Sequence, residues 1–163
     1  MIDDTDRAIL LLLQGDARIS NAEIARRVGM APSAVLERVR KLEARGPVRG
    51  YEARLDGAVL GFGLLAFMFV QSDERVGSGE TGARLAAIPE VLEVHHIAGE
   101  DCYLVKLRVA DTHRLGRLLR DEIGVIPAVR ATRTTIVLST VKETAALPLA
   151  GARDTSAGDD DAG

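Results

Sequence analysis

Residues 21–46, NAEIARRVGMAPSAVLERVRKLEARG, contain two stretches of apolar side chains at helical spacing, interrupted at Gly29-Met30-Ala31. Gly29 suits the left-handed residue that ends a helix, and Pro32 suits the first position of the next one. Gly46 then ends the second stretch. The sequence therefore predicts two short helices joined by a tight turn, each with one buried face and one face left exposed.

A further helix is predicted before this pair, from Asp4 to Gln14, with acidic residues near its positive N-terminal end. Ser20 and Glu23 have capping-box spacing, in which the hydroxyl accepts from the Glu23 amide while the carboxylate reaches back. The apolar pattern assigns these residues to the three inner faces: Ile9, Leu10, Leu12 and Leu13; Ala22, Ile24, Ala25 and Val28; Val35, Leu36, Val39 and Leu42.

Charge is distributed unevenly along the chain, whose formal net charge is -3. From Ile24 to Arg54 eight basic residues accompany three glutamates, whereas from Asp56 onward 11 basic residues are outnumbered by 16 acidic ones. A basic segment joined to an acidic remainder indicates contact with a polyanion, although a solvated helix face gives the same pattern.

Three helices with so tight a turn are typical of a helix-turn-helix, in which one helix braces another in the major groove of double-stranded DNA. The candidates for phosphate contacts are Arg26, Arg27, Arg40, Lys41, Arg45 and Arg49. The candidates for base contacts are Ser33, Ala34, Glu37 and Arg38. Ser20 and Asn21 complete the predicted DNA-binding set. Each residue also has a structural alternative, because exposed Glu and Arg side chains form intrahelical pairs.

In the second half of the chain the apolar residues follow strand patterns as well as helical spacing. Strands are predicted over 64–71, 91–98, 102–109 and 129–140, and helices over 80–88 and 111–123, the latter capped by Asp111 or Thr112. The order β-α-β-β-α-β is typical of the ferredoxin-like fold, so the chain is expected to be α+β. Residues 48–55 add a predicted two-stranded wing.

The first of these strands, in LLAFMFVQ, is apolar on both faces. Helices should cover one face, and the same sheet of a second copy should cover the other, giving a homodimer. Tyr103, Val105 and Leu107, on one face of the strand at 102–109, are expected to add to this apolar contact surface.

The segment DRAILLLLQGDARISNAEIARRVGMAPSAVLERVRKLEARGPVRGY resembles the DNA-binding domain of the Lrp/AsnC family of transcription regulators. IAGEDCYLVKLRV and VRATRTTIVLSTVK resemble the effector loop and last strand of that family's RAM domain. The resemblance implies a winged helix-turn-helix over residues 1–50, a linker strand and connection over 51–63 and a RAM domain over 64–145. The small and acidic residues that follow predict a disordered tail over 146–163. The resemblance also implies homodimers that assemble into tetramers or octamers, with an amino-acid effector bound between RAM domains.

The sequence departs from the family pattern at three places. Ala31 replaces a hydroxyl residue that caps the third helix, a change that costs on the order of 1 kcal/mol unless a neighbour such as Ser33 compensates. Pro47 replaces a bulky apolar residue and removes a backbone donor where the wing begins. In the effector loop, Cys102 stands in place of the second acid, which puts the identity of the amino acid in question.

The predicted effector site comprises Gly99, Glu100, Asp101, Cys102, Tyr103, Thr132 and Thr134. Gly99 lets the backbone approach a ligand closely, and Glu100 or Asp101 can pair with an ammonium group. Thr132 and Thr134 share one face of the last strand and can supply hydroxyls. An ordinary tight turn with solvated acids is the structural alternative.

Other functions find less support in the sequence. No apolar run is long enough to span a membrane, the acidic N-terminal stretch does not resemble a secretory signal, and Cys102 is the single cysteine, so we expect a cytoplasmic protein without disulfides. Adjacent His95 and His96 point to opposite faces of a strand, so we expect no metal site, and we expect no cofactor and no enzymatic activity. Two alternatives remain open: a nucleoid-organising protein with little sequence preference, and an enzyme related to tetrapyrrole decarboxylases on the same two-domain plan.

Overall fold

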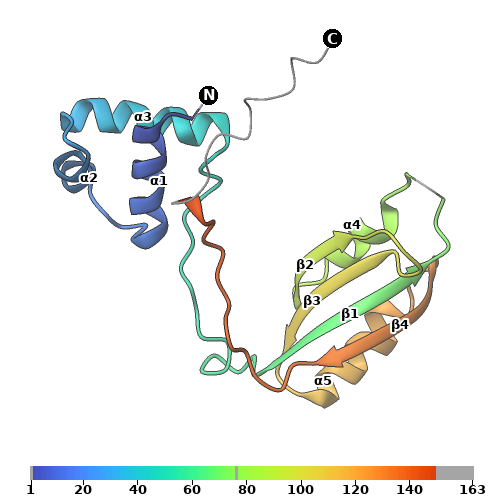
Figure 1. The fold of residues 1–163 in the computed structure, drawn as a ribbon. Helices are drawn as coiled ribbons and strands as arrows, with labels where there is room; N and C mark the ends of the chain where they lie inside the picture. The colour runs from blue at the N-terminus through green and yellow to red at the C-terminus, as the bar shows by residue number, and fades with distance from the viewer. Residues whose placement is uncertain (1, 76, 150–163) are drawn as a thin grey trace, which may run out of the picture. The chain divides into compact units, whose positions relative to one another are not determined.

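The computed structural model describes residues 2–75 and 77–149, and the chain divides into two compact units (Figure 1). The head comprises the chain up to Arg54 together with the segment that begins at Glu143, and the sheet unit comprises Leu55–Lys142. No helix in the described part of the chain is both long and apolar enough to cross a membrane.

Three helices form the head: α1 (Asp4–Gly15), α2 (Asn21–Val28) and α3 (Pro32–Arg45). Ile9, Ile24 and Val35, one from each helix, are fully buried against one another. The predicted inner faces are correct except at Ala22 and Leu36, which are both exposed. Leu36 directly follows the buried Val35 and is turned about 100° away from it around the helix.

The helix ends follow the predicted signals with one exception. Gly29 and Gly46 end α2 and α3 in the left-handed conformation, with φ of 69° and 95°. The Ser20 hydroxyl accepts from the Glu23 amide at 3.2 Å, but the Glu23 carboxylate binds Arg26 and Arg27 instead of reaching back, so the predicted capping box is only half formed. Ala31 caps α3 without a side-chain hydrogen bond, and no described residue, Ser33 included, supplies one in its place.

The predicted wing over 48–55 and the predicted linker strand over 51–63 are wrong, because residues 46–63 contain no strand. A two-stranded wing needs backbone amides that are free to pair between its strands, and two amides at its predicted start are not available. The Val48 amide donates to the Leu42 carbonyl at 3.2 Å, which closes the end of α3, and Pro47 has no amide to donate. Tyr51 instead donates its hydroxyl to Glu43 at 2.9 Å, which ties this segment back to α3.

The sheet unit contains β1 (Leu64–Ser72), α4 (Glu80–Ala86), β2 (Val91–His96), β3 (Tyr103–Val109), α5 (Thr112–Arg117), its π-helical continuation η1 (Leu118–Ile123) and β4 (Val129–Ile136). The strands are antiparallel in the order β2-β3-β1-β4, which confirms the ferredoxin-like prediction. Asp111 caps α5 as predicted, accepting from the Arg114 amide at 2.7 Å. The last strand ends at Ile136, four residues before its predicted end at 140.

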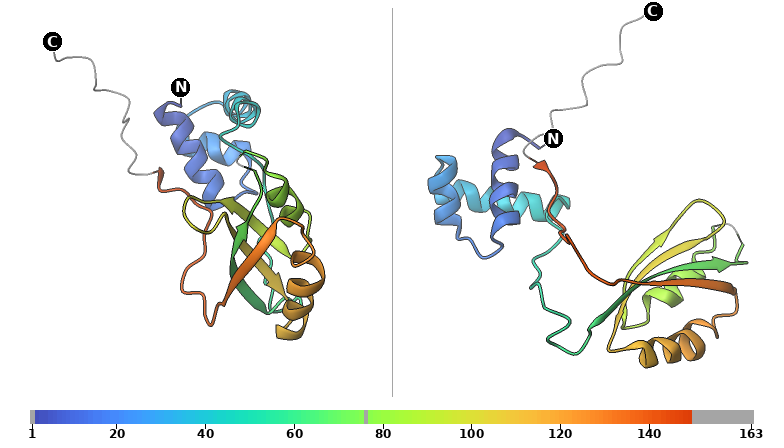
Figure 2. Two further views of the ribbon diagram at one scale, coloured as in Figure 1. Left: turned by 90° about the vertical axis from the view of Figure 1, so that its right-hand side faces the viewer. Right: turned by 60° about the horizontal axis from the view of Figure 1, so that its bottom comes forward.

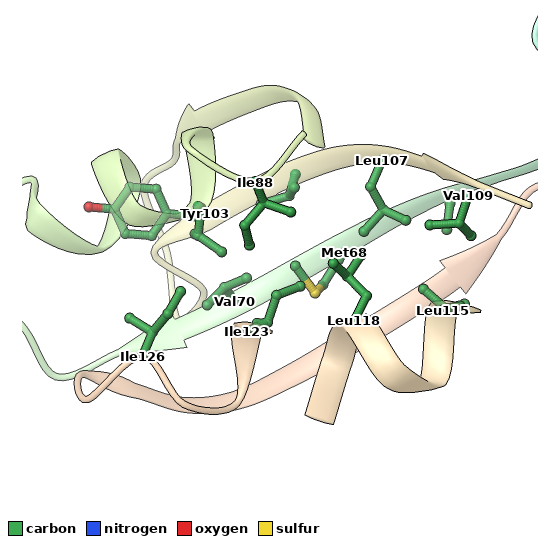
Figure 3. Close-up of a cluster of buried hydrophobic side chains, with 13 residues drawn as sticks. Met68, Val70, Ile88, Tyr103, Leu107, Val109, Leu115, Leu118, Ile123 and Ile126 are labelled. Carbon is green, nitrogen blue, oxygen red and sulfur yellow. The ribbon is translucent and has the colours of Figure 1, made fainter. Parts of the chain in front are cut away.

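Both helices cover the same face of the sheet (Figure 2), and the core of the unit lies between them and that face (Figure 3). Met68 and Val70 of β1 lie in this core beside Leu85 of α4 and Leu118 of η1. Tyr103, Val105 and Leu107 also point into it and are almost completely buried. Their predicted role in an exposed contact surface is therefore wrong, because they belong to the helix-covered face.

The other face of the sheet, which we call the open face, is covered by none of the helices in the described residues. Phe67 and Phe69 of β1 and Leu104 of β3 lie there and are only half-buried. The Arg133 guanidinium stacks on the Phe69 ring at 4.6 Å from its centroid. The apolar residues of β1 are thus shared between two faces, as the sequence predicts, but only one face is packed within the chain.

Residues 143–149, which we call the C-terminal strap, belong to the head. The Gln14 side-chain amide both donates to the Leu147 carbonyl, at 3.2 Å, and accepts from its amide, at 2.6 Å. Leu149 packs against the head's apolar cluster, and Arg54 donates to the Glu143 carbonyl at 2.8 Å. Of the predicted disordered tail, residues 146–149 are thus part of the head, and residues 150–163 lie outside the described part of the chain.

Candidate functional site

The outward face of α3 carries Ser33, Leu36, Glu37 and Arg40, all exposed. Leu36 and Glu37 are each three or four residues from both Ser33 and Arg40, so the four positions form one stripe along the helix. The stripe lies opposite the buried Val35, Val39 and Leu42, and the tight α2–α3 turn immediately precedes it. Ala34, also predicted to contact bases, is half-buried beside the stripe.

The predicted phosphate-binding cations differ in how they are paired. Arg40, Arg45 and Arg49 form no ion pair with any residue that the structure describes. Lys41 Nζ lies 2.6 Å from Glu37 Oε1, and this ammonium lowers the pKa of the Glu37 carboxyl. Exposed i,i+4 pairs of this kind are weak and exchange readily for a stronger anion.

Arg26 and Arg27, at the C-terminal end of α2, both bind the Glu23 carboxylate, with closest N···O distances of 2.6 and 2.7 Å. The two guanidiniums hold the pKa of Glu23 at about 2. Asn21 begins α2 and Ser20 caps it, so both predicted residues lie at the N-terminal end of the bracing helix.

Arg38 forms ion pairs with two carboxylates of the head. Its Nη1 atom lies 2.7 Å from Asp3 Oδ2 and 2.7 Å from Asp6 Oδ1, and its side chain is about one-third exposed. Asp3 and Asp6 form the capping box of α1, so this ion pair joins the start of α1 to the middle of α3. A base contact by Arg38, as the sequence predicts, requires the guanidinium to leave both carboxylates.

The partners of Arg38 were not predicted from the sequence, although one local signal was present. Asp3 and Asp6 have the three-residue spacing of a capping box, which places both carboxylates at the same helix end. The Asp6 amide, followed by Arg38, lowers the pKa of the Asp3 carboxyl.

The β2–β3 loop (residues 97–102) contains most of the predicted effector residues. Gly99 has a φ of 130°, a conformation that favours glycine. Asp101 is committed to Arg133, with an N···O distance of 2.9 Å, and the Cys102 thiol donates to the Ser72 carbonyl at 3.3 Å. Glu100 is exposed and makes no ion pair or hydrogen bond with the residues described, so it is the acid of this loop that is available to a ligand.

Glu100 lines a hollow where β1 ends and β4 begins. The lining residues are Gln71, Ser72, Asp73, Glu100, Arg130 and Ala131. Arg130 and Asp73 form an ion pair of 3.2 Å within it. The hollow therefore offers both a guanidinium and carboxylates at its wall.

Thr132 and Thr134 are not brought to this hollow. They pair with Val70 and Met68, whose side chains lie in the helix-covered core, whereas Gln71 and Ala131 pair on the open face. Thr132 is exposed, and the Thr134 hydroxyl is buried without a hydrogen-bond partner in the described part of the chain.

Tyr103 is also committed within the sheet unit. Its hydroxyl donates to Glu74, whose other oxygen accepts from the Thr81 amide at 2.8 Å, near the start of α4. The hydrogen bond from Tyr103 lowers the pKa of Glu74, while burial and that carboxylate raise the pKa of Tyr103. A Cβ at Gly82 would lie 2.9 Å from the Tyr103 ring, so the close packing of α4 on β3 requires glycine there. Glu74 and Thr81 have no recognisable signal in the sequence.

The described residues contain no group of three His, Cys, Asp or Glu side chains that is placed to hold a metal ion. His95 pairs with Leu104 on the open face and lies 3.3 Å from Glu93. His96 lies on the opposite face, with its ring 5.2 Å from that of Tyr103. The two adjacent histidines therefore point apart, as their strand position predicts.

Family models and relatives match both units. Residues 2–43 match the AsnC-type helix-turn-helix domain, and residues 65–147 match the Lrp/AsnC ligand binding domain. The chain is 38% identical over 148 residues to the HTH-type transcriptional regulator FL11 of Pyrococcus horikoshii, covering 91% of this chain and 97% of that one. It is 37% identical over 144 residues to the leucine-responsive regulatory protein of Escherichia coli K12, covering 87% and 88%.

Solved structures agree with these matches. A transcriptional regulator of Neisseria meningitidis in complex with L-Met superimposes with a TM-score of 0.85 at 32% identity, covering 91% of this chain and 97% of that one. A feast or famine regulatory protein of Mycobacterium tuberculosis complexed with L-methionine gives a TM-score of 0.81 at 38% identity, covering 88% and 96%.

The ion pair of Arg38 generates a prediction about stability and pH. Arg38→Gln should destabilise the head near neutral pH, because Asp3 and Asp6 lose their shared cation. The folded pKa of Asp3 lies below its ordinary value of 3.8, so its stabilising effect is present above that value and is lost as the pH falls through the folded pKa. The difference in unfolding free energy between parent and variant should therefore shrink below about pH 4, as urea denaturation followed by circular dichroism can measure.

Arg49→Gln is the matched control, since it removes a head arginine that has no ion pair among the described residues. It should leave stability nearly unchanged near pH 7 and near pH 3. A loss in Arg38→Gln that stays constant over this range would contradict the assigned role of the ion pair.

Proposed function

The chain belongs to the Lrp/AsnC family of transcriptional regulators, and on this premise we propose that it binds specific DNA sequences under the control of an amino acid or related small metabolite. The head binds double-stranded DNA, and the sheet unit holds the effector and joins copies of the chain. We place the protein in the cytoplasm and assign it no catalytic activity.

The observation that carries the DNA-binding proposal is the exposed stripe of α3 with its unpaired cations. Arg40 and Arg45 have no carboxylate partner among the residues described, and Lys41 has only an exposed one. Cations of this kind supply the phosphate contacts that position a recognition helix, and the remaining side chains of the stripe are placed to meet the base edges. The same stripe distinguishes a specific regulator from a nucleoid-organising protein, which needs cations but no base contacts.

Effector binding is proposed at the hollow beside the β2–β3 loop. An amino acid carries an ammonium group and a carboxylate, and the hollow presents Glu100 to the first and Arg130 to the second. The solved structures of the similar regulators of Neisseria meningitidis and Mycobacterium tuberculosis are complexes with methionine, which supports an amino acid as the ligand. Asp101, Cys102 and Tyr103 are held by other residues of the unit, so we assign them the role of shaping the loop.

Self-association is proposed through the open face of the sheet. Phe67, Phe69 and Leu104 are half-buried there, and a second copy of the face would remove them from water. The dimer then presents two heads to the two halves of a DNA site, and larger assemblies such as tetramers or octamers are built from dimers.

DNA binding should depend strongly on salt. The double variant Arg40→Gln, Lys41→Gln should weaken binding to all sequences and flatten the slope of log K against log salt by about two units, because two phosphates are no longer neutralised. Fluorescence anisotropy at several salt concentrations, with a selected duplex and a random duplex, measures both effects. Arg84→Gln, Arg120→Gln removes the same charge from the sheet unit and should leave the slope unchanged. An unaltered slope in the folded head variant would contradict the assignment of Arg40 and Lys41 to phosphate contacts.

Effector binding should depend on Glu100. In calorimetry with a panel of amino acids including methionine, Glu100→Gln should abolish the binding that the parent shows, because the amide cannot balance the ligand's ammonium charge. Glu80→Gln, an exposed acid of α4, should bind like the parent. Undiminished affinity in Glu100→Gln would show that the effector lies elsewhere.

Assembly should depend on the open face. Light scattering at low micromolar concentration should give a dimer or a multiple of a dimer for the parent. Phe67→Glu should give monomers, because two charged groups would be buried at the contact. Val125→Glu, an exposed apolar residue in the loop between η1 and β4, should assemble like the parent. A monomeric parent would contradict the proposed packing.

A further inference from the structure

We infer that Leu36 reads DNA sequence directly, by contacting the 5-methyl group of a thymine in the major groove. The inference rests on the proposed DNA-binding function and names a specificity-determining residue that the helical pattern assigns to the core.

Leu36 is 36% exposed, whereas Val35, Val39 and Leu42 of the same helix are 0%, 7% and 4% exposed. Leu36 thus lies at the edge of the head's apolar cluster, with about a third of its surface outside it. The exposed part of its side chain is therefore available for contact with a partner of the head.

The partner is indicated by the neighbours of Leu36. It lies between Ser33 and Arg40 on the outward stripe of α3, with Glu37 beside it. The stripe occupies the N-terminal part of the helix that follows the tight turn, which is the part of a recognition helix that approaches base edges. Arg40 is exposed at its end, so the surface around Leu36 is suited to a polyanion rather than to an apolar protein.

The chemistry of the groove then selects the base. Among the groups displayed on the major-groove edges of the base pairs, the thymine methyl is the large apolar one, cytosine has only a C–H at the same position, and the groups that distinguish the other bases are hydrogen-bond donors or acceptors. Leucine has neither donor nor acceptor. Placed against the amino group of cytosine, it would leave that donor without a partner, which is unfavourable.

Arg38 strengthens this assignment. Its guanidinium is held by Asp3 and Asp6, both at 2.7 Å, so it is not free to occupy the groove. Because Arg40 is assigned to phosphate, the side chains of the stripe left to read bases are the polar Ser33 and Glu37 and the apolar Leu36. Leu36 gives this set a preference for thymine that Ser33 and Glu37 do not supply.

The test uses the full chain and a duplex selected by the parent protein from a random pool. Each thymine of that duplex is replaced in turn by deoxyuridine, which removes the methyl group and keeps the base pair. At one thymine of each half-site, the replacement should weaken parent binding about fourfold, the effect of one buried methyl group. Leu36→Ala should bind the original duplex more weakly and should no longer distinguish thymine from uracil at that position.

Leu11→Ala is the matched control, because Leu11 is 39% exposed in the same unit but lies on α1. It should keep the fourfold discrimination. The inference is overturned if no thymine methyl affects the parent, if Leu36→Ala retains the discrimination, or if Leu36→Ala changes the assembly state instead. Failure to select any duplex over random DNA is a different result, which overturns the proposed function and this inference with it.

Discussion

Burial of Ile9, Ile24 and Val35 against one another is the interaction on which the head depends. Helices of the length of α2 are marginal in water, so they persist because each contributes one side chain to this cluster. The same burial fixes the rotation of α3 about its axis. Once Val35 points inward, the stripe from Ser33 to Arg40 must point outward, and the surface offered to DNA follows from the packing of the interior.

The local signals for the fold were readable in the sequence, since they depend on residues close together in the chain. Gly29, Pro32 and Gly46 set the limits of α2 and α3, and alternating apolar residues located the strands. Leu36 was misassigned because adjacent apolar residues leave the exact direction of a helical face open by one position. The prediction of a wing was wrong because the Val48 amide hydrogen-bonds to the end of α3 instead. The pattern of side chains does not decide between these two arrangements of the backbone.

The candidate sites were less predictable, because their geometry depends on residues distant in sequence. Arg38 meets Asp3 and Asp6 more than thirty residues away, and Tyr103 meets Glu74 across the unit. The motif located the β2–β3 loop that we propose for the effector, but not the internal bonds of this loop. These bonds hold Asp101, Cys102 and Tyr103 in place before any ligand arrives, so little ordering of the loop has to accompany binding.

The C-terminal strap has a consequence for how the protein is made. The head takes residues 143–149 from a part of the chain that is synthesised after the whole sheet unit. Domains fold as units in the order in which they leave the ribosome, so the three helices can assemble early, while Gln14 and the apolar cluster wait for Leu147 and Leu149. The DNA-binding unit thus acquires its final contacts only when the regulatory unit has been synthesised, and a chain interrupted before the strap carries an incomplete head.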